Sequence, residues 1–151
     1  MVSPELDAEW ENLDFLFQDD GSGLVDHAHL QREWAEFWPQ TGTRRNWDAV
    51  GILRYGSRTE WLLVEAKAHA EEMMTDCGAK GAGRERIVRA FAQVGADLGV
   101  PDTGTWTEDY YQYANRLATL WFLLKHGIAA RLLYIYFTGE RHDNRACPES
   151  E

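Results

Sequence analysis

Apolar residues recur at helical spacing in four segments of this 151-residue chain. Residues three or four positions apart share one face of an α-helix, so the spacing predicts helices that each bury one side. The first runs from Ser3 to the sequence DDGSG, the second follows Asp26, and the later ones cover residues 84–98 and about 105–127. The pattern therefore predicts two helices in the N-terminal part of the chain and two more in its second half.

Residues that start or stop helices fit these four segments. Ser3, followed by proline, and Asp26 are residue types that cap helix N-termini. Pro39 would end the second helix, while Gly99 and Gly127 would end the last two.

Three shorter segments are predicted strands. Residues 46–54 and 60–68 are apolar and flank the turn-rich sequence YGSRT, which indicates a hairpin, and residues 130–138 form a last strand. The order is helix, helix, strand, strand, helix, helix, strand. We expect one α/β domain over residues 1–151, with a helical segment at 1–40, a core at 41–139 and a polar tail at 140–151.

The composition is that of a globular domain. Hydrophobic residues make up 44% of the chain, and seven tryptophans supply large apolar area for a core. No stretch approaches the ~20 apolar residues of a membrane-spanning helix, and the N-terminus does not look like a signal peptide, so we expect a soluble cytoplasmic protein with no membrane partner. Cys77 and Cys147 are isolated, which favours free thiols over a disulfide or a zinc site.

Acidic charge is concentrated near the N-terminus. The net charge is −10, yet residues 1–40 hold ten acidic residues and one basic residue, which leaves residues 41–151 nearly neutral. A modest basic patch over residues 80–89 is a candidate for phosphate contact, although a solvated helix face explains it equally well. The patch consists of Lys80, Arg84, Arg86 and Arg89.

Charged residues stand at the end of the second hairpin strand. The apolar run 62–64 is followed by Glu65, Ala66 and Lys67, and alternation along a strand projects Glu65 and Lys67 from one face. Asp48 lies at the end of the neighbouring strand, within reach of Glu65 if the strands pair. Two such carboxylates suit Mg²⁺ or Mn²⁺, which prefer oxygen ligands.

An Asp, a hairpin and a Glu-x-Lys sequence resemble the signature of the PD-(D/E)XK nuclease superfamily. The sequences WDAVG, LLVEAKAHAEEM and YYQYANRLATLWFLL resemble an uncharacterised bacterial subgroup of it, over roughly residues 30–139, although Trp47 replaces the proline of the motif. The resemblance implies a restriction-endonuclease-like fold, in which a mixed β-sheet core is flanked by α-helices.

The resemblance also implies roles for individual residues. Asp48 and Glu65 would bind the metal, the Ala66 carbonyl would complete its shell, and Lys67 would be the catalytic lysine. Glu33, at the border of the apolar face of its helix, is a candidate for an additional metal ligand.

A polar face of the last helix supplies further candidates. Gln112, Asn115 and Arg116 share one side and resemble the helix motif that related nucleases direct at the active site, although a hydrated helix face would look the same. His69 continues the face of Glu65 and Lys67, and a structural histidine is its alternative reading.

Three functions fit these residues. A Mg²⁺-dependent nuclease acting on DNA or RNA is the leading hypothesis. A non-catalytic module that keeps the fold for protein contacts, including self-association as a homodimer, is the second, and a phosphoesterase with another substrate is the third. For the charged residues themselves, a structural ion pair between Glu65 and Lys67 is the alternative.

Overall fold

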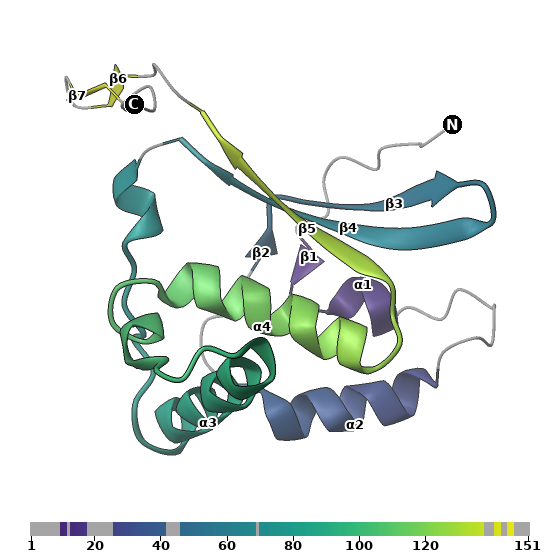
Figure 1. Cartoon of the computed structure of the whole chain (residues 1–151), viewed down its shortest axis with the longest axis horizontal. Helices are drawn as coiled ribbons and strands as arrows, with labels where there is room; N and C mark the ends of the chain where they lie inside the picture. The colour runs from purple at the N-terminus through teal and green to yellow at the C-terminus, as the bar shows by residue number, and fades with distance from the viewer. Residues whose placement is uncertain are drawn as a thin grey trace.

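The computed structural model describes residues 10–11, 13–17, 26–41, 46–68, 70–137, 141–142 and 145–146. They form a mixed α/β structure in which one three-stranded sheet lies against a layer of helices (Figure 1). Within the described residues, no helix is long and apolar enough to cross a membrane.

The sheet has the order β3-β4-β5. β3 (Ala49–Tyr55) and β4 (Arg58–Lys67) are antiparallel, and β4 and β5 (Ala130–Tyr136) are parallel. The predicted hairpin and last strand are therefore confirmed. Gly56 has a φ of 59°, a left-handed conformation that glycine adopts without steric cost, and this permits the tight turn between β3 and β4.

Three long helices pack below the sheet in Figure 1: α2 (His27–Phe37), α3 (Gly81–Leu98) and α4 (Tyr111–Lys125). The Asp26 carboxylate accepts a hydrogen bond from the His29 N–H at 2.9 Å, which confirms the predicted cap of α2. Gly99 ends α3 in a left-handed conformation, as expected.

α4 starts later than the sequence predicts. The short helix η2 (Gly104–Trp106) precedes it, and the N–H groups of Tyr111 and Gln112 donate to the Thr75 carbonyl and Thr75 Oγ1, at 2.9 Å each. Thr75 follows η1 (Ala70–Met73). The first N–H groups of a helix lack intrahelical partners, so a residue distant in sequence fixes this helix start.

The predicted N-terminal helix is wrong at Trp10–Glu11. These residues form β1, which pairs with β2 (Asn46–Trp47), and the described helix α1 covers only Asp14–Phe17. The helical spacing of apolar side chains does not reveal backbone pairing with a segment distant in sequence. Here the backbone of Trp10–Glu11 pairs with β2 and forms a strand instead of a helix. Residues 3–9 of the predicted helix lie outside the described residues.

The segment predicted as a polar tail contains one short pairing. β6 (Arg141–His142) and β7 (Arg145–Ala146) are antiparallel to one another. Residue 140, residues 143–144 and residues 147–151, which include Cys147, lie outside the described residues.

The core lies among the helices and against one face of the sheet. Aromatic rings of α2 pack on α4: the Trp34 and Phe122 ring centroids are 4.9 Å apart, and those of Phe37 and Phe122 are 5.5 Å apart. Leu63 of β4 is fully buried in the same cluster. Residues on this face of β4 are therefore enclosed by helices, and the functional candidates Glu65 and Lys67 follow Leu63 on that face.

Candidate active site

Glu65 and Lys67 lie on the buried face of β4. Leu63, Glu65 and Lys67 alternate with more exposed neighbours, and their exposed fractions are 0%, 1% and 9%. This confirms that the two charged side chains share a face. A carboxylate with 1% exposure has lost its hydration shell, so protein groups must supply its hydrogen bonds.

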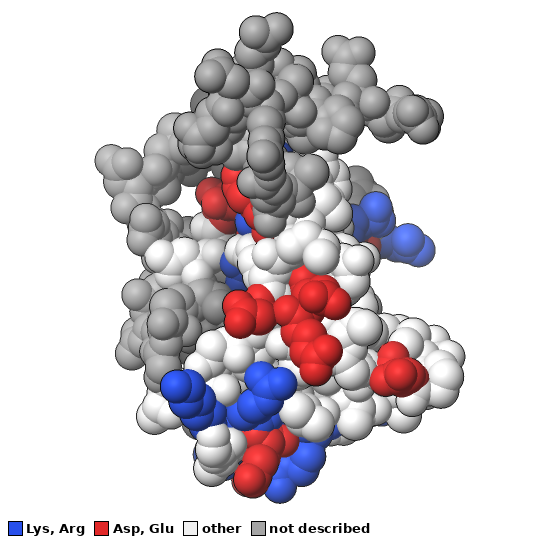
Figure 2. Space-filling model, turned by 90° about the vertical axis from the view of Figure 1, so that its left-hand side faces the viewer, with Lys and Arg blue, Asp and Glu red and all other residues white. Residues whose placement is uncertain are grey.

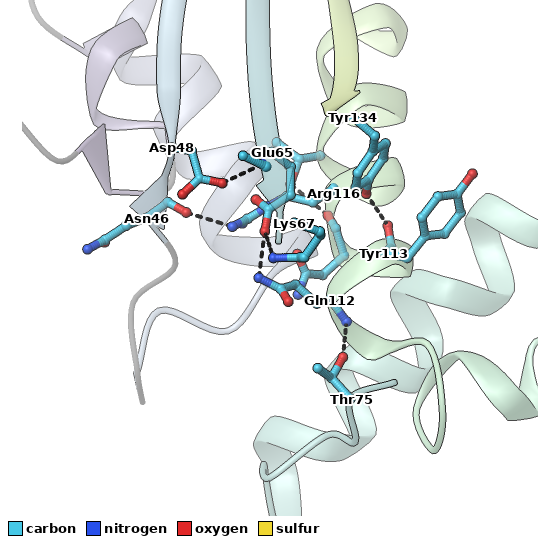
Figure 3. A network of polar contacts seen from close by, with 12 residues as sticks. Asn46, Asp48, Glu65, Lys67, Thr75, Gln112, Tyr113, Arg116 and Tyr134 are labelled. Carbon is cyan, nitrogen blue, oxygen red and sulfur yellow. Dashed lines mark hydrogen bonds and ion pairs between the residues drawn. The ribbon is translucent and has the colours of Figure 1, made fainter. Parts of the chain in front are cut away.

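Three side chains donate hydrogen bonds to Glu65 (Figure 3). Lys67 Nζ and Gln112 Nε2 donate to Oε1 at 2.5 and 2.6 Å, and Arg116 Nε donates to Oε2 at 2.7 Å. Gln112 and Arg116 lie four residues apart on α4, so one turn of the helix places both opposite the strand end. Both side chains therefore contact the Glu65 carboxylate.

Arg116 connects α4 to β4 and to β2 through hydrogen bonds. Its Nη2 donates to the Asn46 carbonyl of β2 at 2.6 Å, and its guanidinium lies 4.4 Å from the centroid of the Trp47 ring. Arginine suits this position because its planar group can donate in several directions while stacking on an aromatic ring. With 3% exposure, Arg116 forms a buried ion pair with Glu65.

Asp48 occupies the bend between β2 and β3. Ala49 pairs with Val64, so Asp48 stands beside Glu65 in the adjacent strand. Its Oδ2 accepts a hydrogen bond from the Ala66 N–H at 2.6 Å, and its side chain is exposed. The hairpin therefore brings the two predicted carboxylates to neighbouring positions, one buried and one open to solvent.

The Ala66 carbonyl points to the Asp48 side of β4. The N–H and C=O of a strand residue point the same way, and successive residues alternate. The Ala66 N–H meets Asp48, whereas the next carbonyl, of Lys67, accepts from the Phe137 N–H on the β5 side at 2.9 Å. The Ala66 carbonyl and the Asp48 side chain thus lie on the same edge of β4.

The donor set has the chemistry of a hard-cation site. Asp48, Glu65 and the Ala66 carbonyl are oxygen donors, and Mg²⁺ is held by one or two carboxylates with water in the other positions. An ionised carboxylate has about four acceptor sites, of which the hydrogen bonds to Glu65 use three. One acceptor site of Glu65 is therefore left for a cation, beside the exposed carboxylate of Asp48.

Glu33 does not join this group. Its carboxylate lies 4.0 Å from His29 on α2, and 41% of its side chain is exposed. Among the described residues, no three His, Cys, Asp or Glu side chains are close enough to hold a metal together. A cation at the site would have two carboxylate ligands, Asp48 and Glu65.

Two further residues that the sequence singled out are Asn115 and His69. Asn115 is buried with 2% exposure, and its Oδ1 has no hydrogen-bond partner among the residues that the structure describes. His69 lies outside the described residues. The contributions of Thr75 and of the Asn46 carbonyl were missed, because neither has a local sequence signal.

The four residues of the predicted basic patch do not share one environment. Arg84 donates to the Cys77 carbonyl at 3.2 Å and Arg86 to the Ala35 carbonyl at 2.9 Å, so both join backbone segments, whereas Lys80 and Arg89 are exposed. Figure 2 shows Lys and Arg side chains at the lower end of one face, with Asp and Glu between them and above. The surface there is mixed in charge.

A pocket opens beside the charged cluster. Its lining joins β4, η1, α4 and β5, and consists of Lys67, Glu72, Met73, Tyr110, Gln112, Tyr113, Tyr134 and Tyr136. Burial raises the pKa of Tyr134 far above its usual range and raises that of Tyr136 as well, so both hydroxyls stay protonated at neutral pH. Lys67 thus belongs to the buried cluster and also lines this small pocket.

The chain was compared with known proteins. No protein-family model matches it, and neither the curated proteins nor the solved structures contain a match.

Proposed function

We propose that this protein is a divalent-metal-dependent nuclease, a hydrolase of phosphodiester bonds in nucleic acid. The observation that carries the proposal is the position of Lys67. Its ammonium group contacts the buried Glu65 at 2.5 Å, beside Asp48, while the same side chain lines the pocket. Because the Lys67 side chain contacts Glu65 and also lines the pocket, its ammonium group can contact a phosphodiester bound there.

The arrangement of elements supports a restriction-endonuclease-like fold. An antiparallel hairpin carries Asp48 and Glu65, and two helices then lead to a strand parallel to the second hairpin strand. This agrees with the sequence resemblance to the PD-(D/E)XK superfamily. The sheet that the structure describes has three strands in a mixed parallel and antiparallel arrangement.

Charge balance favours a divalent cation bound together with an anionic substrate. Asp48 and Glu65 offset the positive charges of Lys67 and Arg116, so the four groups have a formal net charge of zero. Mg²⁺ or Mn²⁺ held by Asp48, Glu65 and the Ala66 carbonyl would supply Lewis-acid stabilisation and activate water. A bound divalent cation would give the site a formal net charge of +2. Since a phosphodiester is negatively charged, we expect the metal and the phosphodiester to strengthen each other's binding.

Each residue then has a defined role. Arg116 and Gln112 hold the Glu65 carboxylate in place, and Arg116 remains its buried counter-charge. Lys67 donates hydrogen bonds to a phosphoryl oxygen as negative charge develops there in the transition state. Water adds to phosphorus, one phosphorus–oxygen ester bond breaks, and the departing oxygen takes a proton.

A non-catalytic interaction module is the second candidate. The specific observation in its favour is that Glu65 already accepts three hydrogen bonds, two of them from cations, as a structural cluster would. A phosphoesterase acting on another substrate uses the same residues as a nuclease and differs only in what the pocket admits.

Metal titration and a substrate panel test these alternatives together. Single- and double-stranded DNA and RNA are incubated with wild-type protein in Mg²⁺ or Mn²⁺, with a chelator as control. We expect metal-dependent cleavage of at least one substrate, and calorimetric metal binding that Asp48→Asn weakens, since the amide is a poorer ligand but still accepts the Ala66 hydrogen bond. Equal metal affinity in both proteins contradicts the metal site.

A further inference from the structure

Tyrosine rings dominate the pocket beside Lys67. Four of its eight lining residues are tyrosines, and three of these, Tyr110, Tyr113 and Tyr136, are 42%, 47% and 45% exposed. Single exposed aromatic residues are common on protein surfaces, whereas a contiguous group of them often marks a binding site. Their concentration around one hollow marks a surface suited to a planar apolar ligand.

The rings are arranged as a stack rather than at random. Tyr113 and Tyr134 have ring centroids 5.0 Å apart with planes 22° from parallel, and Tyr134 and Tyr136 are 6.1 Å apart and 12° from parallel. The Tyr134 hydroxyl donates to the Tyr113 carbonyl at 3.3 Å, which joins β5 to α4 (Figure 3). Tyr134 is the inner ring, and its neighbours on either side are exposed.

The strand register places this stack next to the charged cluster. Glu65 pairs with Tyr134, and Lys67 pairs with Tyr136, across β4 and β5. Paired residues of adjacent strands project to the same face of the sheet, so the Tyr136 ring is the immediate lateral neighbour of the Lys67 side chain. A molecule that contacts both must carry a negative group beside a flat ring.

The pocket has a positive group, Lys67, and a negative group, Glu72, which would orient a bound ligand. Lys67 attracts a phosphate, whereas Glu72, an exposed carboxylate in the lining, repels one and accepts hydrogen bonds from amino groups. Bases with exocyclic amino groups supply such donors. The charge distribution therefore fits a nucleotide with its phosphate at Lys67 and its base towards Glu72.

We propose that an exposed tyrosine ring at this pocket stacks on one unpaired base next to the phosphodiester at Lys67, and that the substrate is single-stranded nucleic acid. The inference rests on the proposed function for the identity of the phosphate. A base within a duplex has both faces covered by its neighbours, whereas an unpaired base can stack on a tyrosine. The tyrosine rings thus favour an unpaired strand over a duplex.

Equilibrium binding tests the pocket separately from cleavage. Fluorescein-labelled oligonucleotides are titrated in chelator, where no hydrolysis occurs, as a single strand, a duplex, and a single strand whose bases are replaced by abasic residues. We expect wild-type protein to bind the base-containing single strand most tightly. Tyr136→Ala should weaken that binding about 5- to 150-fold, the range for losing one stacked base.

Two matched variants control for nonspecific effects. Tyr136→Phe keeps the ring and should bind nearly as wild type. Phe137→Ala removes an exposed aromatic side chain from the next position, which alternation assigns to the opposite face, and should leave affinity unchanged. Unchanged affinity in Tyr136→Ala, or equal binding of duplex and single strand, overturns the proposal.

Cleavage assays with the same reagents separate the two proposals. If wild type binds the single strand through its bases but cleaves nothing with Mg²⁺ or Mn²⁺, the pocket is supported and the nuclease function is contradicted. If wild type cleaves base-containing and abasic strands at equal rates, and Tyr136→Ala does the same, the nuclease function is supported and the pocket is contradicted.

Discussion

Two carboxylates on β4 bind arginines in similar ways but in different surroundings. Glu60, near the hairpin turn, accepts from Arg131 Nε at 2.5 Å, and Glu65, at the far end, accepts from Arg116 Nε at 2.7 Å. The Arg131 side chain is 60% exposed, whereas that of Arg116 is 3% exposed. The chemistry of the two ion pairs is the same, and their access to water differs.

This difference separates a surface interaction from a candidate site. Exposed ion pairs contribute little because water and salt screen them. A buried pair pays the desolvation of both charges, and apolar residues of similar volume often stabilise a protein as well or better. The Glu65 cluster is thus poorly explained by stability alone, and its position between Asp48 and an open pocket favours a chemical role.

The largest expected effect is on the buried carboxylate. Glu65→Gln removes the negative charge and leaves Lys67 and Arg116 as buried cations without the carboxylate that both contact. We expect the free energy of unfolding to fall by roughly 3–5 kcal/mol. Urea denaturation at pH 7 measures the loss.

Glu60→Gln is the matched control, since it makes the same substitution on the same strand. Its effect on unfolding should be much smaller, because Arg131 remains hydrated. Equal losses in the two variants would remove the distinction between the two regions.

A smaller effect concerns the acid titration of Glu60. The hydrogen bond from Arg131, followed by that from Tyr55, holds the pKa of Glu60 below its ordinary value of 4.5. A lowered pKa means that the contribution of Glu60 to stability is fully present above pH 4.5 and is lost as the pH falls through the folded-state value. NMR titration should show the pKa of Glu60 rising towards 4.5 in Arg131→Gln, and an unmoved pKa refutes this ion pair.

The smallest effect is expected for exposed basic residues of the α3 region. Lys80 and Arg89 are exposed, whereas Arg84 and Arg86 donate to backbone carbonyls. If the exposed pair contacts phosphates, Lys80→Ala with Arg89→Ala should reduce the slope of log affinity against log salt by about 1.4 for a single strand. An unchanged slope shows that the patch is a solvated helix face.

Local patterns predicted most of the fold. The hairpin, α2, α3 and β5 each have their own periodicity and end signals, and the structure confirms them within a few residues. The N-terminal helix failed at Trp10–Glu11 because backbone pairing with β2 overrode side-chain spacing. The start of α4 was misplaced because its capping partner, Thr75, comes from another part of the chain.

The candidate site was predictable to a different degree. Strand alternation and the hairpin sufficed to bring Asp48, Glu65 and Lys67 together. The resemblance added Gln112 and Arg116, but not the contact of Arg116 with Glu65, which depends on how α4 packs on the sheet. The tyrosine pocket also escaped prediction, since it combines residues from four elements.

The most direct test of the account is the cleavage rate of Lys67→Met in Mg²⁺, measured together with its melting temperature. Methionine keeps an unbranched apolar stem and removes the ammonium group, while Arg116 continues to neutralise Glu65. We expect wild type to cleave single-stranded nucleic acid, and we expect the variant to remain folded but to lose about 10²–10³ in rate, as when a transition-state donor is removed. Strong destabilisation of the variant, with no metal-dependent cleavage of any substrate by wild type, would contradict the account and leave Lys67 as a structural partner of Glu65.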